Sequence, residues 1–86
     1  MSEIQQLRKQ VDDVDDRILK ALSERVKICK AIGNAKKKQG LPVKDSERET
    51  AVYRRIKEKA AKLGLDSRQV EAVYREIVNI CSAVQE

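Results

Sequence analysis

Arg25 and Lys36 are the residues whose types and spacing first suggest chemistry. They are eleven residues apart, which is three turns of an α-helix, so both side chains project from nearly the same face. The residues between them on that face are Cys29, Ile32 and Gly33. Small side chains there would leave a concavity walled by two cations, which suits a small organic anion better than a polyanion. Membership of a solvated basic run, Lys36 to Lys38, also explains Lys36 taken alone.

Arg25 also occupies a position where an apolar side chain is expected. Apolar residues follow a heptad from Ile4 to Ala35, and Arg25 is the one charge at either core position of that repeat. Burying an unpaired guanidinium is costly, so Arg25 requires an anion. That anion is either a ligand or an internal carboxylate such as Asp15 or Glu49.

Two further polar residues lie on apolar faces of later segments. Glu49 is in line with the apolar residues that follow it, and Gln85 follows Cys81 by one helical turn. Each has another explanation: Glu49 has the spacing of a capping box with Ser46, and Gln85 lies near a terminus that can fray. Taken with the two cations, they predict a polar site inside a helical bundle.

The missing residue types exclude several kinds of chemistry. The chain of 86 residues has no histidine, which excludes Ser-His-Asp and Cys-His arrangements and any zinc site that contains histidine. Cys29 and Cys81 have no Cys-x-x-Cys spacing and are expected to be buried free thiols. We therefore expect no metal and no cofactor.

The net charge of +5 makes an anionic partner plausible, and nucleic acid is the first to weigh. Most charges alternate in sign, and the two tyrosines are the only aromatic residues, so stacking on bases has little support and no nucleic-acid partner is expected. No apolar run reaches the roughly 20 residues that span a bilayer, and the first residues lack the pattern of a signal peptide. We expect a cytoplasmic protein without a membrane partner.

Helical periodicity extends over nearly the whole chain, and the expected fold class is all-α. Gly40 and Pro42 end a first helix at about residues 3–39. Asp45 or Ser46 caps a second at about 45–63, and Asp66 caps a third at about 66–85. The expected apolar stripes are Val52, Ile56, Ala60 and Leu63, followed by Val70, Val73, Tyr74, Ile77, Cys81 and Val84. We expect one domain over residues 1–86.

Helix length predicts the oligomeric state. A helix over residues 3–39 would be about 55 Å long, whereas each later helix spans only about 30 Å. The two shorter helices cannot cover the whole heptad stripe, and half of it would face water in a monomer. We therefore predict a homodimer in which the long helices pair.

The order of these residues is similar to that of the AroQ class of chorismate mutases, over essentially the whole chain. The residues that match are Leu7-Arg8, Asp15, Glu24-Arg25, Gly33 to Lys36, Pro42-Val43, Asp45, Arg48-Glu49 and Gln85. The resemblance implies a hooked three-helix protomer in an intertwined homodimer with two active sites. It also implies an isomerase that converts chorismate into prephenate in phenylalanine and tyrosine biosynthesis. We expect a monofunctional enzyme.

The resemblance assigns the anion-binding and catalytic roles to four residues. It implies that Arg25 and Arg8 bind carboxylates, with Arg8 reaching in from the other subunit. Lys36 would contact the ether oxygen and a carboxylate, and Gln85 would donate to the ether oxygen. Lys36, Gln85 and Arg25 are thus the expected catalytic residues.

The resemblance also implies the remaining contacts to substrate. Asp45, partly through its backbone, and Glu49 would hold the ring hydroxyl, while Arg48 would assist the anionic end. Many members of the family have a serine four residues before the glutamine, where this chain has Cys81 with Ser82 beside it. Because a thiol is a weaker hydrogen-bond donor, Cys81 is either a substrate contact or a packed side chain.

Two other functions are compatible with the same residues. An isochorismate pyruvate lyase shares the fold and much of the cationic site, although Asp45 with Arg48-Glu49 matches the mutase pattern. A helical dimerisation module without a ligand would use its polar core residues to set the register of the helices.

Overall fold

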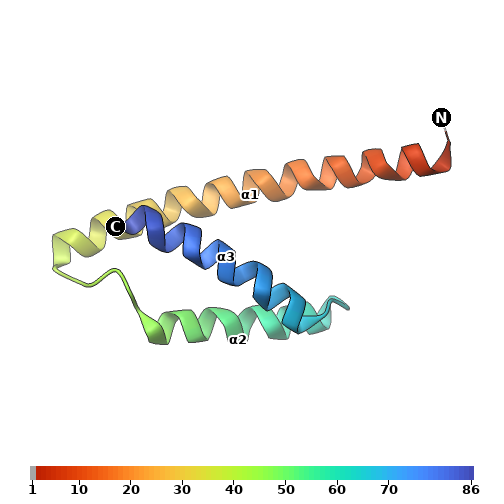
Figure 1. Ribbon diagram of the computed structural model, residues 1–86. Helices are drawn as coiled ribbons and strands as arrows, with labels where there is room; N and C mark the ends of the chain where they lie inside the picture. The colour runs from red at the N-terminus through yellow and green to blue at the C-terminus, as the bar shows by residue number, and fades with distance from the viewer. Residues whose placement is uncertain (1) are drawn as a thin grey trace.

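The computed structural model describes residues 2–86, which form three α-helices (Figure 1). The helices are α1 (Glu3–Gln39), α2 (Ser46–Lys62) and α3 (Ser67–Gln85), and residues 2–86 contain no strand. The predicted all-α class, with one long N-terminal helix and two shorter ones, is confirmed. None of these helices is both long enough and apolar enough to cross a membrane.

The ends of α1 are set by local hydrogen bonds. At its start, Ser2 and Gln5 form a capping box in which the side chain of each accepts from the backbone N–H of the other. At its end, Gly40 adopts the left-handed conformation with φ 68°, and the N–H of Leu41 donates to the carbonyl oxygen of Lys36 at 2.8 Å. This turn sends the chain back toward α2.

Asp45, and not Ser46, caps α2. The Asp45 carboxylate accepts a hydrogen bond from the backbone N–H of Arg48 at 3.0 Å. The capping box expected of Ser46 and Glu49 is wrong, because Ser46 is already the first helical residue. Glu49 is therefore free of a capping role. Asp66 caps α3 in the same way as Asp45 caps α2.

The third helix is packed on two sides. It lies between α1 and α2, which do not pack on each other (Figure 1). Toward α2, a small core consists of Val52, Ile56 and Val78, with Tyr53, Val70 and Tyr74 packed against it. Toward α1, the turns that carry Cys81 and Gln85 make the contact.

Three residues of the expected apolar stripes are exposed within the chain. Leu63 is 75% exposed because it lies just past the end of α2, and Val73 and Val84 are also exposed. A single stripe is too simple a description of α3, which uses one face for α2 and another for α1. Val78 is buried for this reason, although the expected stripe did not include it.

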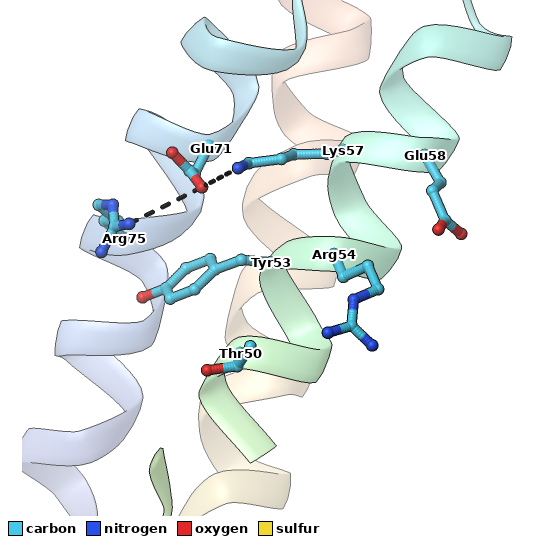
Figure 2. A pocket seen from close by; sticks show the side chains of 7 residues that line it. All are labelled: Thr50, Tyr53, Arg54, Lys57, Glu58, Glu71 and Arg75. Atoms are coloured by element: carbon cyan, nitrogen blue, oxygen red, sulfur yellow. Dashed lines mark ion pairs between the residues drawn. The ribbon is translucent and has the colours of Figure 1, made fainter. Parts of the chain in front are cut away.

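An ion-pair cluster joins α2 to α3 on the side away from α1 (Figure 2). The Glu71 carboxylate forms an ion pair with Nζ of Lys57 at 2.8 Å and lies 3.7 Å from Nη2 of Arg75. The Arg75 guanidinium also lies over the Tyr53 ring, 4.6 Å from the ring centre. The hydrogen bond from Lys57 is the main cause that lowers the pKa of Glu71. The ion pair between Lys57 and Glu71 connects α2 to α3.

Much of the apolar surface of α1 is exposed to solvent. Its N-terminal end extends beyond both shorter helices, and α3 diverges from α1 toward α2 (Figure 1). We call its exposed heptad residues the α1 seam: Ile4, Leu7, Val11, Val14, Ile18, Ile28 and Ile32. This agrees with the sequence analysis, which predicted that much of the heptad stripe of the long helix would face water in an isolated chain.

Gly33 permits the closest approach of α3 to α1. A Cβ atom at this position would lie 2.8 Å from the backbone Cα of Gln85 and 3.0 Å from its Cβ. Backbone atoms cannot move aside as a flexible side chain can, so the contact requires glycine although glycine weakens a helix. The end of α3 is held against α1 by this contact.

We predict that Gly33→Ala lowers the urea midpoint of unfolding. Crowding in a packed contact costs about 1–3 kcal/mol, which outweighs the gain of about 1 kcal/mol in helix propensity. Asn34→Ala is the matched control, because Asn34 is the exposed neighbour and should be unaffected or slightly stabilised. At one protein concentration, a Gly33→Ala midpoint at or above that of Asn34→Ala would contradict the proposed contact.

Candidate functional site

A cavity of about 280 Å³ lies where the three helices meet. Its polar wall is formed by Arg25 and Lys36 from α1, Asp45 and Arg48 at the start of α2, and Ser82 and Gln85 from α3. The apolar wall includes Ile32, Val52 and Val78, and two cysteines complete the lining. The concavity predicted between Arg25 and Lys36 is therefore present, and the other helices close it.

The structure brings together most, but not all, of the residues expected in the site. Six of the eight line the cavity: Arg25, Lys36, Asp45, Arg48, Cys81 and Gln85. Glu49 does not line it and lies half-buried in the first turn of α2. Arg8 is exposed, about 42 Å from Lys36 along α1. Within one chain, Arg8 cannot reach this cavity.

Lys36 is held in place from two other parts of the chain. Its Nζ donates to the carbonyl oxygen of Val43 at 2.6 Å and to Oε1 of Gln85 at 2.7 Å. An ammonium has three N–H donors, so one remains for a ligand. Because the amide oxygen of Gln85 is turned to Lys36, its NH₂ group is left to donate as well. The ammonium of Lys36 and the amide NH₂ of Gln85 are therefore two neighbouring groups that can each donate a hydrogen bond to a ligand.

The partners of Arg25 in the structure are sulfur atoms. Its Nη1 donates to the Sγ of Cys81 at 2.8 Å and lies 3.7 Å from the Sγ of Cys29. Among residues 2–86, neither Asp15 nor Glu49 forms an ion pair with it. Thiols do not neutralise a guanidinium, so no ion pair compensates the positive charge of Arg25 among the described residues.

Both cysteines are buried free thiols, as the sequence predicted. Burial raises the pKa of the Cys29 thiol, and the neighbouring thiol of Cys81 raises it further. Both thiols line the cavity, next to the guanidinium of Arg25.

Several groups that line or support the cavity were not expected as site residues, among them Val52. The carbonyl of Val43 is a backbone group, which no side-chain pattern identifies. Val78 lies beside the expected stripe of α3, and the two-sided packing of that helix explains its position. Ser82 lines the cavity with a hydroxyl, and its place next to Cys81 was the one available signal.

A larger hollow of about 510 Å³ lies over the α2–α3 ion-pair cluster (Figure 2). Lys57 and Arg75 line it, but Glu71 already pairs with both of them. It contains none of the eight expected site residues. The smaller cavity is the stronger candidate for an anion site, because it gathers most of the expected site residues and, among residues 2–86, no carboxylate forms an ion pair with its Arg25 or Lys36.

Comparison with known proteins agrees with this geometry. Residues 7–86 match the family described as chorismate mutase type II. A chorismate mutase from Methanocaldococcus jannaschii is 27% identical over 85 residues, which cover 99% of this chain and 86% of that protein. A conserved hypothetical protein from Pyrococcus furiosus has a similar structure, with a TM-score of 0.81, 30% identity, and coverage of 100% of this chain and 99% of that one.

Some relatives are much longer than this chain. A bifunctional chorismate mutase/prephenate dehydratase from Aquifex aeolicus is 35% identical over 88 residues. The matched region is 99% of this chain but 24% of that protein. The chain thus spans about a quarter of the length of this relative.

Proposed function

The chain belongs to the chorismate mutase type II family, an isomerase family, and from this premise we propose that its cavity converts chorismate into prephenate. The single observation that carries the proposal is the convergence of Arg25, Lys36 and Gln85 on one cavity. Among residues 2–86 no carboxylate forms an ion pair with Arg25 or Lys36, and the Gln85 amide uses its oxygen to accept from Lys36, which leaves its NH₂ group as a donor. The cavity therefore suits a small anion that also carries an acceptor oxygen.

The reaction needs no group that this chain lacks. Chorismate rearranges by an intramolecular 3,3-sigmatropic shift, in which a C–O bond breaks as a C–C bond forms. No nucleophile or obligatory proton transfer takes part, so the absence of histidine from the chain is compatible with it. Catalysis consists of holding the substrate in its compact conformer and stabilising negative charge that grows on the ether oxygen.

Lys36 and Gln85 are the groups that would stabilise the ether oxygen. The remaining N–H of Lys36 and the NH₂ of Gln85 are adjacent, because the two side chains are hydrogen-bonded to each other. The 2.6 Å bond to the Val43 carbonyl further restricts the ammonium. Donors that are already oriented need little reorganisation as charge develops, which is the source of their catalytic effect.

The other lining residues would bind the two ends of the substrate. Arg25 and Arg48 bind its carboxylates, since a guanidinium pairs with a carboxylate through two donors. Asp45 accepts from a backbone N–H with one oxygen, which leaves the other for the ring hydroxyl. Glu49, which has no capping role, is the second partner that we propose for this hydroxyl.

Cys81 is best explained as a support for Arg25. It lines the cavity, but its sulfur accepts from the guanidinium at 2.8 Å. A thiol is a weak donor, and the hydroxyl of neighbouring Ser82 lines the same cavity. We therefore propose that Ser82, rather than Cys81, makes the hydroxyl contact to substrate.

We infer that the working enzyme is a homodimer. The α1 seam leaves seven large apolar side chains exposed, and Val11 and Ile18 are each 58% exposed. A continuous apolar face of this length on a soluble monomer would be unusual. The seam includes Ile32, which also lines the cavity, so a second chain on the seam would also cover the site.

Such a dimer supplies the missing Arg8. In an antiparallel pair centred on the middle of α1, residue 8 lies opposite residue 34 of the partner subunit, within one turn of Lys36. Arg8 would then complete the partner's cavity from its open side. Each site would use one cation that its own chain cannot provide.

We propose that the chain acts in phenylalanine and tyrosine biosynthesis and lies in the cytoplasm. Neither the lyase nor the dimerisation module is favoured, since the family match and the cationic cavity both fit the mutase.

We predict that Lys36→Ala lowers kcat for the conversion of chorismate into prephenate by at least about 100-fold, as loss of an oxyanion donor does. Lys37→Ala is the matched control, because Lys37 belongs to the same basic run, is exposed and does not line the cavity. Loss of chorismate is followed by its ultraviolet absorbance, with prephenate identified as the product. Full turnover by Lys36→Ala, or release of pyruvate by the unmodified chain, would contradict the proposal.

We predict that mixed dimers restore activity lost in two separate variants. Arg8→Ala and Arg25→Ala should each be nearly inactive. When they are unfolded and refolded together in equal amounts, about half of the dimers contain both chains, each with one intact site, so about a quarter of wild-type activity returns.

The control for this experiment is a mixture of Arg25→Ala with Lys36→Ala. Arg25 and Lys36 line the cavity of their own chain, so every site in this mixture lacks one of them. No activity should return. Equal recovery in both mixtures, or no recovery with the Arg8→Ala mixture, would show that Arg8 does not cross between subunits.

A further inference from the structure

Cys29 and Cys81 are a pair of thiols that the proposed reaction does not use. One belongs to α1 and the other to α3, and both are buried. Nη1 of Arg25 lies 3.7 Å from the first sulfur and 2.8 Å from the second. The two sulfur atoms are therefore at most 6.5 Å apart, and a hydrogen bond with the Cys81 thiol is among the causes that raise the pKa of Cys29.

The contact between the helices explains why the thiols meet. Cys29 comes four residues before Gly33, and Cys81 comes four residues before Gln85. Gly33 and Gln85 are the point of close approach between α1 and α3. The cysteines therefore occupy the adjoining turns of the two helices, where the packing of α3 on α1 holds them face to face.

The Arg25 guanidinium contacts both thiols. Its Nη1 lies closer to Cys81 than to Cys29, and a neighbouring cation is the usual feature of a cysteine that reacts with peroxides. Because Cys81 is the nearer thiol, it is the one expected to react first. Both thiols line the cavity, which gives a small oxidant a route to them.

We propose that Cys29 and Cys81 form a reversible intramolecular disulfide when the protein meets a peroxide, and that this bond switches off the site. The second part rests on the proposed function. In the reduced protein, Cys81 supports the guanidinium of Arg25. In the oxidised protein, its sulfur is bonded to Cys29, and the support is lost.

The chemistry balances with hydrogen peroxide as the oxidant. The Cys81 thiolate attacks one peroxide oxygen, the O–O bond breaks, and hydroxide leaves and takes up a proton to form water. Cys81 is then a sulfenic acid. Cys29, after losing its proton, attacks the Cys81 sulfur and displaces a second water as the S–S bond forms. Two thiols are oxidised and one peroxide is reduced, and exchange with a small dithiol reverses the bond.

The test uses the full chain and two independent readouts. Protein treated with hydrogen peroxide is denatured in the presence of a thiol-alkylating reagent, and its mass and free thiols are measured. We expect a monomer-mass species that has lost two hydrogens and has no thiol to alkylate. We also expect chorismate turnover to fall at least about tenfold, since Arg25 is displaced but not removed, and dithiothreitol to restore it.

The Cys29→Ala variant is the control. It retains Cys81 but cannot form the intramolecular bond, so it should give no species that lacks two hydrogens. Its treated sample is compared with its own reduced sample. Because Cys81 of this variant can still become a sulfenic acid, the control is read by mass: a species that lacks two hydrogens in Cys29→Ala would contradict the assignment of the bond to Cys29 and Cys81.

Two results with the wild-type chain would overturn the proposal. One is the survival of both thiols, or bonds only between chains. The other is an intramolecular disulfide with unchanged turnover. If the disulfide forms but even the reduced protein does not turn over chorismate, the proposed function fails while the modification site is supported.

Discussion

The close contact between Gly33 and Gln85 is the constraint on which the rest of the structure depends. It brings the backbone of α3 to a distance from α1 that only a glycine permits. Gln85 is thereby placed at 2.7 Å from Lys36, and Cys81, one turn earlier, at 2.8 Å from Arg25. The two cavity cations, Arg25 and Lys36, thus each obtain a partner from α3. A helix-weakening glycine inside a 37-residue helix is explained by what it positions.

A second constraint is that the three helices do not cover one another. Of the two short helices only α3 packs on α1, and the α1 seam remains exposed from Ile4 to Ile32. Ile32 belongs both to the seam and to the lining of the cavity. A second chain that packed on the seam would therefore also reach the cavity. A second chain would bury the seam and bring Arg8 to the cavity. In this account the active site and the hydrophobic interface are parts of one surface.

Helix periodicity and capping chemistry were sufficient to predict the all-α class, and the eleven-residue spacing of Arg25 and Lys36 was sufficient to predict the concavity between them. Other features depend on tertiary contacts that no local pattern contains. Asp45 and Ser46 are equally good caps in sequence, and only the path of the connection selects Asp45. The expected partner of Arg25 was either a ligand or an internal carboxylate, and among residues 2–86 its neighbour from α3 is a sulfur. The role of Arg8 rests on family resemblance, because its position depends on a second chain.

The most direct test of the shared site is a sedimentation equilibrium series, with chorismate turnover measured on the same samples. The account predicts a species of about twice the 9.8 kDa chain mass at micromolar concentration. On dilution, specific activity should fall in proportion to the fraction of dimer. A well-folded monomer that retains full specific activity would contradict the account, because Arg8 of one chain could not then take part in the site of another.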